Sequence, residues 1–374
     1  MRIRGLGVLL AIVACAPDEP AAEPWTWSLP PGFPEPFVPE DNPMTAEKVE
    51  LGRHLFHDVR LSFNETMACA SCHEQARAFT DGKATNVGAS GHALTRNSMG
   101  LANAAYLSVY TWANPMLGDL EAQALVPMFA DFPLELGVQK DTPAILRRFA
   151  DDPTYQELFA AAFPGDDDPF TTERIVQALA AFQRTLISGD SAYDRYIYRG
   201  DEGAMSESAI RGMQLFFSEL GECYHCHAGV NFSTAFRSAA TEPGPPDFQN
   251  NGLYNLDEFG AYPLGNGGLY ELTGDPRDHG KFRVPSLRNV ALTAPYMHDG
   301  SIATLAEVID HYAAGGRNIV EGPLAGDGRL NPNKSPLVRE IPLTAQDKAD
   351  LVAFLESLTD EAFVRDPKFG PPGG

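Results

Sequence analysis

Two short stretches decide the fold of this 374-residue chain: Cys69-Ala70-Ser71-Cys72-His73 and Cys223-Tyr224-His225-Cys226-His227. Both follow the pattern C-x-x-C-H, which is typical of covalent attachment of a c-type haem. Two thiols on one short turn can form thioethers with both vinyl groups of a porphyrin, and the histidine that follows can bind the iron. A redox disulfide would not need that histidine, and a four-ligand zinc site usually joins pairs that lie nearer together.

The sequence therefore predicts two covalently bound haem c groups. The predicted attachment residues are Cys69, Cys72, Cys223 and Cys226, and the predicted proximal ligands of the iron atoms are His73 and His227. A weak repeat, G-x-x-L-F, precedes each motif at Gly52–Phe56 and Gly212–Phe216. We expect two related haem domains, at residues 44–200 and at residues 201–374.

Helical periodicity dominates the rest of the pattern. Thr171 can cap a helix whose apolar residues share one face, and Thr344 with Asp347 resembles a capping box before another such helix. Strand-like alternation is scarce, and the chain has 34 glycines and 30 prolines, which indicate many turns. The predicted class is mainly α, with two cytochrome c-like haem domains joined by long Gly/Pro-rich loops.

Composition and charge exclude some classes of protein. Hydrophobic residues make up 44% of the chain and charged residues 21%, which is ordinary for a globular protein and excludes wholesale disorder. The formal charge of −22 would repel a phosphate backbone, so nucleic acid is not an expected partner.

The N-terminus has the features of an export signal. Arg2 and Arg4 precede a short apolar run, so residues 1–14 are predicted to be a signal peptide. The run ends in a sequence that resembles a lipobox, in which Cys15 would be lipidated; ordinary cleavage is the alternative. Residues 15–43 would then form an extended lipoprotein tether. We expect a periplasmic protein, anchored by lipid alone to the outer membrane of a Gram-negative bacterium.

Other stretches support a family resemblance. The stretches are Arg96-Asn97-Ser98, Ala181-Phe182-Gln183-Arg184-Thr185-Leu186 and Ala294-Pro295-Tyr296-Met297-His298-Asp299-Gly300. Together with the haem motifs, these stretches resemble the di-haem cytochrome c peroxidase and MauG superfamily, over roughly residues 44–364. Three more are most similar to the MbnH branch, in which a relative modifies a tryptophan on a partner protein: Asp41–Thr45, Thr111–Pro115 and Pro133–Gly137.

The resemblance implies a second ligand for the haem of the C-terminal domain. Thr304 and Glu307 predict a capping box for a helix that points Tyr312 inward. Tyr312 lies fourteen residues after His298, where the peroxidases have a methionine ligand and MauG-like proteins a tyrosine. An anionic oxygen donor would favour higher oxidation states of the iron. The alternative is a core tyrosine, with Met297 or another methionine as the ligand.

For the haem of the N-terminal domain, the resemblance implies an open distal side. Many of these peroxidases have a histidine sixteen residues after the motif, but that position is Ala89, and we interpret the nearby His92 as a loop residue. Glu135 matches the distal glutamate that would move a proton between the peroxide oxygens, and Gln123 matches its polar neighbour. The alternative for Glu135 is a solvated residue after a Phe-Pro turn.

Two further features follow from the resemblance. Trp112 would lie between the haems and transfer charge between them, unless it is a plain core aromatic residue. A structural calcium ion would be bound by Asn97 and by backbone oxygens of Thr293 and Pro295, since oxygen donors suit calcium; otherwise Asn97 is a turn residue.

The resemblance predicts a haem-dependent peroxidase or oxidoreductase. It would react with hydrogen peroxide, store two oxidising equivalents in a bis-Fe(IV)-like state, and oxidise a residue, expected to be a tryptophan, on a periplasmic partner. The partner would be a copper-binding, MbnP-like protein, or else a small cytochrome or cupredoxin that donates electrons. The alternatives are a peroxide-scavenging di-haem cytochrome c peroxidase and a non-catalytic di-haem electron carrier.

Overall fold

The computed structural model describes residues 25–373 except residues 242, 245 and 246, so the predicted signal peptide and Cys15 lie outside the described residues. The α-helices in the described part are α1 (Ala46–His57), α2 (Leu120–Phe129), α3 (Thr142–Ala150), α4 (Pro153–Ala162), α5 (Thr172–Arg184), α6 (Ala192–Arg199), α7 (Glu207–Phe216), α8 (Tyr270–Thr273), α9 (Leu305–Ala313) and α10 (Ala345–Glu356). Two antiparallel strand pairs accompany them: β1 (Phe248–Gln249) with β2 (Phe282–Arg283), and β3 (Asn318–Ile319) with β4 (Gly326–Asp327). The predicted mainly α class is confirmed.

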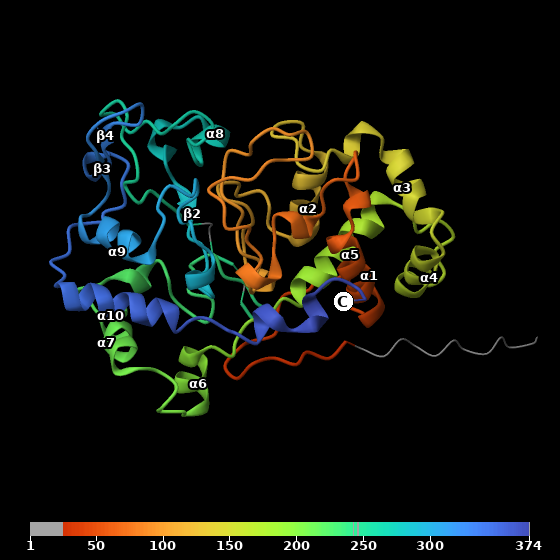
Figure 1. The fold of residues 1–374 in the computed structure, drawn as a ribbon, viewed down its shortest axis with the longest axis horizontal. Coiled ribbons are helices and arrows are strands. Elements are labelled where there is room, and N and C mark those ends of the chain that lie inside the picture. Colours follow the sequence, from red (N-terminus) through yellow and green to blue (C-terminus); the bar gives the residue numbers. More distant parts are fainter. Residues whose placement is uncertain (1–24, 242, 245–246, 374) are drawn as a thin grey trace, which may run out of the picture.

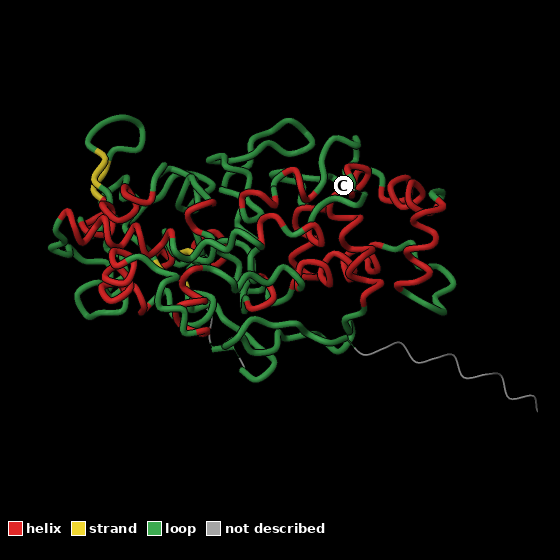
Figure 2. Tube along the Cα trace, turned by 60° about the horizontal axis from the view of Figure 1, so that its bottom comes forward, coloured by secondary structure: helices red, strands yellow, loops and turns green. Residues whose placement is uncertain are grey.

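The helices form two groups, with α1 to α5 in one half of the molecule and α7, α9 and α10 in the other (Figure 1). Figure 2 shows loops filling much of the space between these groups. The first core includes Leu51, Phe56, Phe149, Phe159 and Phe182. The second core includes Tyr193, Phe216, Phe232, Leu351 and Phe354. Each half therefore buries its own apolar residues.

The chain crosses between the halves more than once. Phe363, Val364 and Phe369 belong to the first core, although they follow α10, and the C-terminus lies beside α1 (Figure 1). Residues 25–43, the described part of the predicted tether, have no helix or strand, but Phe33 is buried against Tyr106. The domain boundary near residue 200 and the role of the tether stay predictions.

The G-x-x-L-F repeat marks two equivalent helix crossings. In α1, a Cβ on Gly52 would lie 2.0 Å from the carbonyl oxygen of Ala178 in α5. In α7, a Cβ on Gly212 would lie 1.9 Å from the carbonyl oxygen of Asp350 in α10. Only a residue without a side chain allows this close approach of two backbones. The repeated glycine therefore sets the helix pair in each half of the molecule.

The capping signals in the sequence define the helix starts. The boxes at Thr304–Glu307 and Thr344–Asp347 form as predicted, and Thr171 caps α5. Helix α5 ends at Arg184, and Ser191 caps a further helix, α6. Within the described part of the chain, no helix has the length and apolar character needed to cross a membrane.

Candidate functional site

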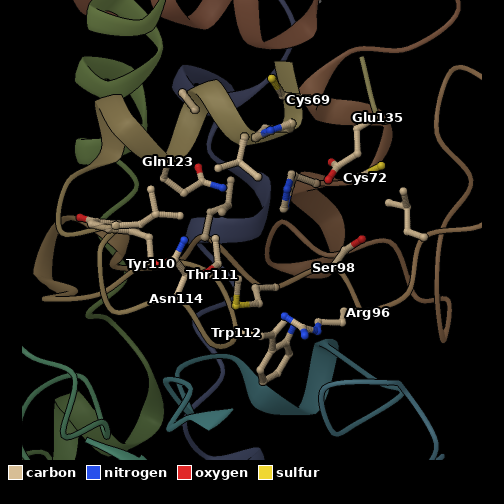
Figure 3. Close-up of a pocket in the computed structure, with 18 of the residues that line it drawn as sticks. Cys69, Cys72, Arg96, Ser98, Tyr110, Thr111, Trp112, Asn114, Gln123 and Glu135 are labelled. Carbon is tan, nitrogen blue, oxygen red and sulfur yellow. The ribbon is translucent and has the colours of Figure 1, made fainter. Parts of the chain in front are cut away.

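A cavity of about 400 Å³ lies in the first half of the molecule. Its walls include Cys69, Cys72 and His73 from the first haem motif, together with Gln123 of α2 and Glu135. Figure 3 shows the side chains of Gln123 and Glu135 pointing from different elements toward the same space. Among the described residues that line this cavity there is no second histidine. The structure thus brings the predicted attachment residues and the predicted peroxide residues into one cavity.

A second cavity of about 270 Å³ lies in the other half. Cys223, Cys226 and His227 line it, and Tyr312 faces them from α9. The other inward residues of α9 also line this cavity, namely Leu305, Val308 and Ile309. The inward orientation predicted for this face of the helix is therefore what the structure shows.

The two motif histidines are held in the same way. His73 Nδ1 lies 2.8 Å from the carbonyl oxygen of Phe79, and His227 Nδ1 lies 3.0 Å from that of Phe232. Because a carbonyl can only accept, Nδ1 has the proton, and Nε2 of the neutral ring keeps its lone pair. Burial lowers the pKa of both imidazoles and favours this neutral form. Both phenylalanines have a left-handed backbone, with φ of 64° and 48°.

The four motif cysteines fit covalent attachment of haem. None of them is in a disulfide. Burial raises the pKa of the Cys69, Cys72 and Cys223 thiols to about 12, and that of Cys226 to about 11. These thiols are therefore neutral in the metal-free protein. Each cavity presents two thiols and one imidazole with a free lone pair, which is the donor set of a haem c.

Glu135 lies in an unusual environment for a carboxyl group. Burial raises the pKa of Glu135 to about 7. The backbone at Leu134, next to Glu135, packs closely against Gly88. A Cβ on Gly88 would lie only 2.0 Å from the Leu134 carbonyl oxygen. Ala89 N also donates to the Glu135 carbonyl oxygen, at 2.7 Å. The carboxyl group therefore lies in the cavity with a pKa near neutrality, which suits a group that accepts and returns a proton.

The protonation state of the Tyr312 phenol depends on whether a cation lies next to its oxygen. Burial raises the pKa of Tyr312 to about 12, while a hydrogen bond from the Asn251 side chain acts in the opposite direction. A phenol with this pKa ionises at neutral pH only when a positive centre faces its oxygen. Met297, the alternative ligand, also lines this cavity, and its Sδ lies 3.2 Å from Asn251 Nδ2. The ligand role of Tyr312 stays a prediction.

Trp112 lines both cavities. Its Nε1 donates to the backbone oxygen of Asn97 at 2.8 Å, and its ring contacts that of His298 with 6.5 Å between centroids. The indole is thus fixed between the two predicted haem sites, where an easily oxidised residue can connect them.

The predicted calcium residues lie together. Asn97, Thr293 and Pro295 all line the second cavity, on the side shared with Trp112. Asn97 Nδ2 donates to the Lys83 carbonyl oxygen at 2.8 Å, which fixes the orientation of the amide. Calcium binding by these oxygens stays a prediction.

Arg283 is a residue of the site that the sequence did not indicate. It lines both cavities, is only 4% exposed, and donates to the Thr111 carbonyl oxygen at 2.9 Å. Burial lowers the pKa of Arg283 to about 10, and no ion pair joins it to a carboxylate in the described part of the chain. A buried cation usually has an anionic partner, and the propionate groups of a haem would supply one. Its sequence context matches no motif, so no local signal could have revealed it.

Comparison with known proteins agrees with this geometry. The family described as di-haem cytochrome c peroxidase matches residues 46–203. The chain is also 36% identical to cytochrome-c peroxidase IdrP1 of Denitromonas iodatirespirans, over 98% of this chain and 96% of that protein.

The chain belongs to the di-haem cytochrome c peroxidase and MauG family.

Other relatives represent the MauG side of the family. This di-haem family member is 33% identical to the methylamine utilization protein MauG of Methylorubrum extorquens, over 86% of this chain and 81% of that protein. A solved structure of a MauG-like protein associated with microbial copper homeostasis is 50% identical, with a TM-score of 0.91 over 93% of this chain and 99% of that chain. The protein is therefore a haem-dependent peroxidase or oxidoreductase with two haem c groups in cytochrome c-like domains.

Proposed function

We propose that this protein reacts with hydrogen peroxide in the first cavity, stores two oxidising equivalents, and uses them to oxidise a tryptophan on a partner protein. The observation that carries the proposal is that Trp112 lines both haem cavities. A residue shared in this way makes the two centres one redox unit. The substrate then does not need to reach the iron, because the second centre can accept electrons from a partner at the surface.

The chain's own residues supply proton transfer on the peroxide side. The haems supply the iron centres that react with peroxide and hold oxidising equivalents. Glu135 accepts a proton from one peroxide oxygen and gives it to the other oxygen, which leaves as water. The pKa of Glu135, about 7, allows the carboxyl group both to accept and to release this proton near neutral pH. Gln123, on the same cavity wall, orients the peroxide by hydrogen bonding. Arg283, which lines both cavities, would pair with a haem propionate.

The second cavity is closed by the chain itself. Tyr312 and His227 would both hold the iron of the second haem, and an anionic phenol oxygen would favour its higher oxidation states. Asn97, Thr293 and Pro295 bind a calcium ion that keeps the region around Trp112 rigid.

The partner and the location follow from the chain's charge and its relatives. The formal charge of −22 favours a partner with a basic or metal-rich face. The MauG-like structure at 50% identity comes from a protein associated with copper homeostasis, which supports a copper-binding partner of the MbnP type. We place the protein in the periplasm, with a lipid on Cys15 as its membrane anchor.

A scavenging peroxidase is the second candidate, because several relatives are named cytochrome c peroxidases. In that case a small reduced cytochrome would return both electrons. No histidine other than His73 is found among the described residues that line the first cavity, which favours an open, peroxide-ready site without prior reduction. A carrier without catalysis would require six ligands at both iron atoms.

The deciding experiment adds one equivalent of peroxide to the diferric protein and follows the absorption spectrum. The proposal expects a long-lived state in which both haems are oxidised, and its decay on adding the partner protein. Trp112→Phe is expected to prevent the second haem from responding, whereas Trp27→Phe, which changes a residue that lines neither cavity, should behave like the wild type. Rapid return that requires reduced cytochrome c would instead identify a scavenger.

The Tyr312→Phe variant tests the second ligand. Loss of the phenolic oxygen is expected to change the absorption of the haem attached at Cys223 and Cys226 and to raise its reduction potential, because an anionic donor is removed. Tyr106→Phe changes a tyrosine that does not line this cavity and serves as the control. Unchanged spectra of both haems in Tyr312→Phe would rule out the ligand.

A further inference from the structure

A path of aromatic rings leads away from Trp112 through a third apolar cluster, which includes Tyr254, Tyr262 and Phe282. The His298 ring lies 6.5 Å from that of Trp112 and 6.1 Å from that of Tyr262, measured between centroids. The Tyr254 ring follows, 5.5 Å from that of Tyr262 in an edge-to-face contact. Aromatic side chains at centroid separations of about 4.5–7 Å are in contact. The rings therefore form a continuous path that begins between the two cavities.

The first step of this path is also bridged by backbone hydrogen bonds. Trp112 Nε1 donates to the Asn97 carbonyl oxygen, and Asn97 N donates to the His298 carbonyl oxygen, both at 2.8 Å. The His298 imidazole stacks on Phe282, with 3.7 Å between the centroids. Burial lowers the pKa of His298 to about 4, so the ring is neutral. The His298 ring itself therefore has no positive charge that would oppose passage of an oxidising equivalent.

The two tyrosines of the path differ in their hydrogen-bond partners. The Tyr254 hydroxyl donates to Asp299 Oδ2 at 2.6 Å. The Tyr262 hydroxyl donates to Asn250 Oδ1 at 3.0 Å, and an amide cannot take up the proton. Oxidation of a phenol releases its proton, so a carboxylate at hydrogen-bond distance makes the oxidation easier. An oxidising equivalent on this path is therefore most stable at Tyr254.

The end of the path is protected and ordered. Tyr254 is only 2% exposed, and its carbonyl oxygen accepts a hydrogen bond from Asn331 Nδ2 at 2.7 Å. Asp299 Oδ1 accepts from Ser301 N at 3.1 Å, and Arg317 donates to the Ser301 hydroxyl at 3.0 Å. Burial and Asp299 raise the pKa of Tyr254 to about 12, so the phenol has its proton at neutral pH. A radical formed there would be shielded from solvent.

We propose that Tyr254 and Asp299 form a proton-coupled redox site, which takes one oxidising equivalent from Trp112 as the state with both haems oxidised slowly decays in the absence of a protein substrate. One electron passes from Tyr254 to oxidised Trp112, the phenolic O–H bond breaks, and the proton moves to Asp299 Oδ2. Hydrogen peroxide is the oxidant, and Tyr254 replaces one of the two electrons that peroxide has taken from the haem-loaded protein. A one-electron donor, such as a small reduced cytochrome, reverses the step, and the proton returns from Asp299.

This inference rests on the proposed function, because Trp112 must be oxidised by the haem pair. The test adds one equivalent of peroxide to the haem-loaded full chain without a protein substrate, then records electron paramagnetic resonance and haem absorption in parallel. The wild type is expected to show a tyrosyl radical that grows in as the absorption of the doubly oxidised haem state declines. Tyr254→Phe should lose it, and Asp299→Asn should lose it although the phenol is present.

A matched control is available in Tyr106→Phe. Tyr106 is buried as deeply as Tyr254, but its hydroxyl donates to the Pro34 carbonyl oxygen at 2.7 Å. A backbone carbonyl accepts the hydrogen bond but cannot take up the proton that oxidation of the phenol would release. This variant is expected to keep the radical. If Tyr254→Phe does not load haem, Asp299→Asn and Tyr262→Phe decide the question, because both keep the proposed radical residue.

The outcomes separate the inference from the proposed function. A wild type without a tyrosyl signal, whose haem absorption nevertheless changes with peroxide, overturns the inference alone. A signal that survives in both Tyr254→Phe and Asp299→Asn does the same. Haem absorption that does not respond to peroxide at all overturns both proposals.

Discussion

Replacing Glu135 by glutamine is expected to slow the reaction with hydrogen peroxide by about 10²–10⁴-fold, the usual contribution of a positioned proton-transfer group. Glutamine has nearly the same shape but cannot accept a proton, so haem binding and the volume of the cavity should be preserved. Stopped-flow mixing of the diferric protein with peroxide measures the rate. Asp131→Asn, which changes an exposed carboxylate in the same loop, is the matched control. A Glu135→Gln rate within experimental error of the wild type would exclude the proton-transfer role.

The pH dependence gives an independent check of Glu135. Its pKa is raised to about 7 by burial, and the carboxylate form is the one that accepts the peroxide proton, so the wild-type rate should rise as pH increases through 7. This rise should be absent in Glu135→Gln.

The stability of the fold should fall as pH rises, whereas the reaction rate should increase. A raised pKa means that the folded state binds the Glu135 proton more tightly than the unfolded state, so stability is greatest below the unfolded pKa and falls as pH rises through about 7. Between pH 4 and pH 8, the free energy of unfolding of the wild type should therefore fall by up to about 3 kcal/mol more than that of Glu135→Gln. Urea unfolding of the haem-loaded protein at the two pH values measures the difference. An equal pH dependence of stability in both proteins would contradict the assigned environment.

Gly212→Ala is expected to destabilise the protein by about 3 kcal/mol or more, at the upper end of the range for overpacking. The new Cβ would lie 1.9 Å from the Asp350 carbonyl oxygen, and a backbone atom inside α10 cannot rotate away as a side chain can. The helices must separate, which also loosens the contact between Phe216 and Phe354, whose ring centroids lie 5.0 Å apart. The higher helix propensity of alanine offsets only about 1 kcal/mol of this.

The midpoint of urea unfolding of the haem-loaded protein measures the effect of Gly212→Ala. Gly203→Ala is the control, because a Cβ at that position would meet only Asp201 Oδ1, at 3.6 Å. Gly52→Ala should behave like Gly212→Ala, since its Cβ would lie 2.0 Å from the Ala178 carbonyl oxygen in the equivalent crossing. If Gly212→Ala unfolded at the same midpoint as Gly203→Ala, the close helix crossing would not exist in solution.

Local chemistry explains which parts of the fold the sequence predicts correctly. The capping boxes at Thr304 and Thr344 involve residues three apart, so their geometry depends on one turn of chain and can be read directly. The G-x-x-L-F repeat is a weak signal in the sequence, because only the packed structure shows that its two glycines lie at helix crossings. Helix α6 is not among the predicted helices, although its start also has a local signal, because Ser191 is its N-cap.

Long-range packing decides the rest of the candidate site. Arg283 follows no motif, and it reaches the wall shared by the two cavities because β2 pairs with β1 and its side chain bonds to Thr111. The residues after α10 return to the first core, which no local pattern indicates. The hydrogen bond from Tyr254 to Asp299 joins residues 45 positions apart in the chain.

The sequence by itself determined that the chain binds two haem c groups in a mainly helical fold, because thioether attachment and helix capping both depend on residues within a few positions of one another. Only the tertiary structure decided that Trp112 and Arg283 lie between two cavities, that the Glu135 carboxyl group is buried, and that Tyr254 meets a carboxylate. These properties depend on which distant segments pack together and on the loss of water from the space between them, and neither is encoded in a local pattern.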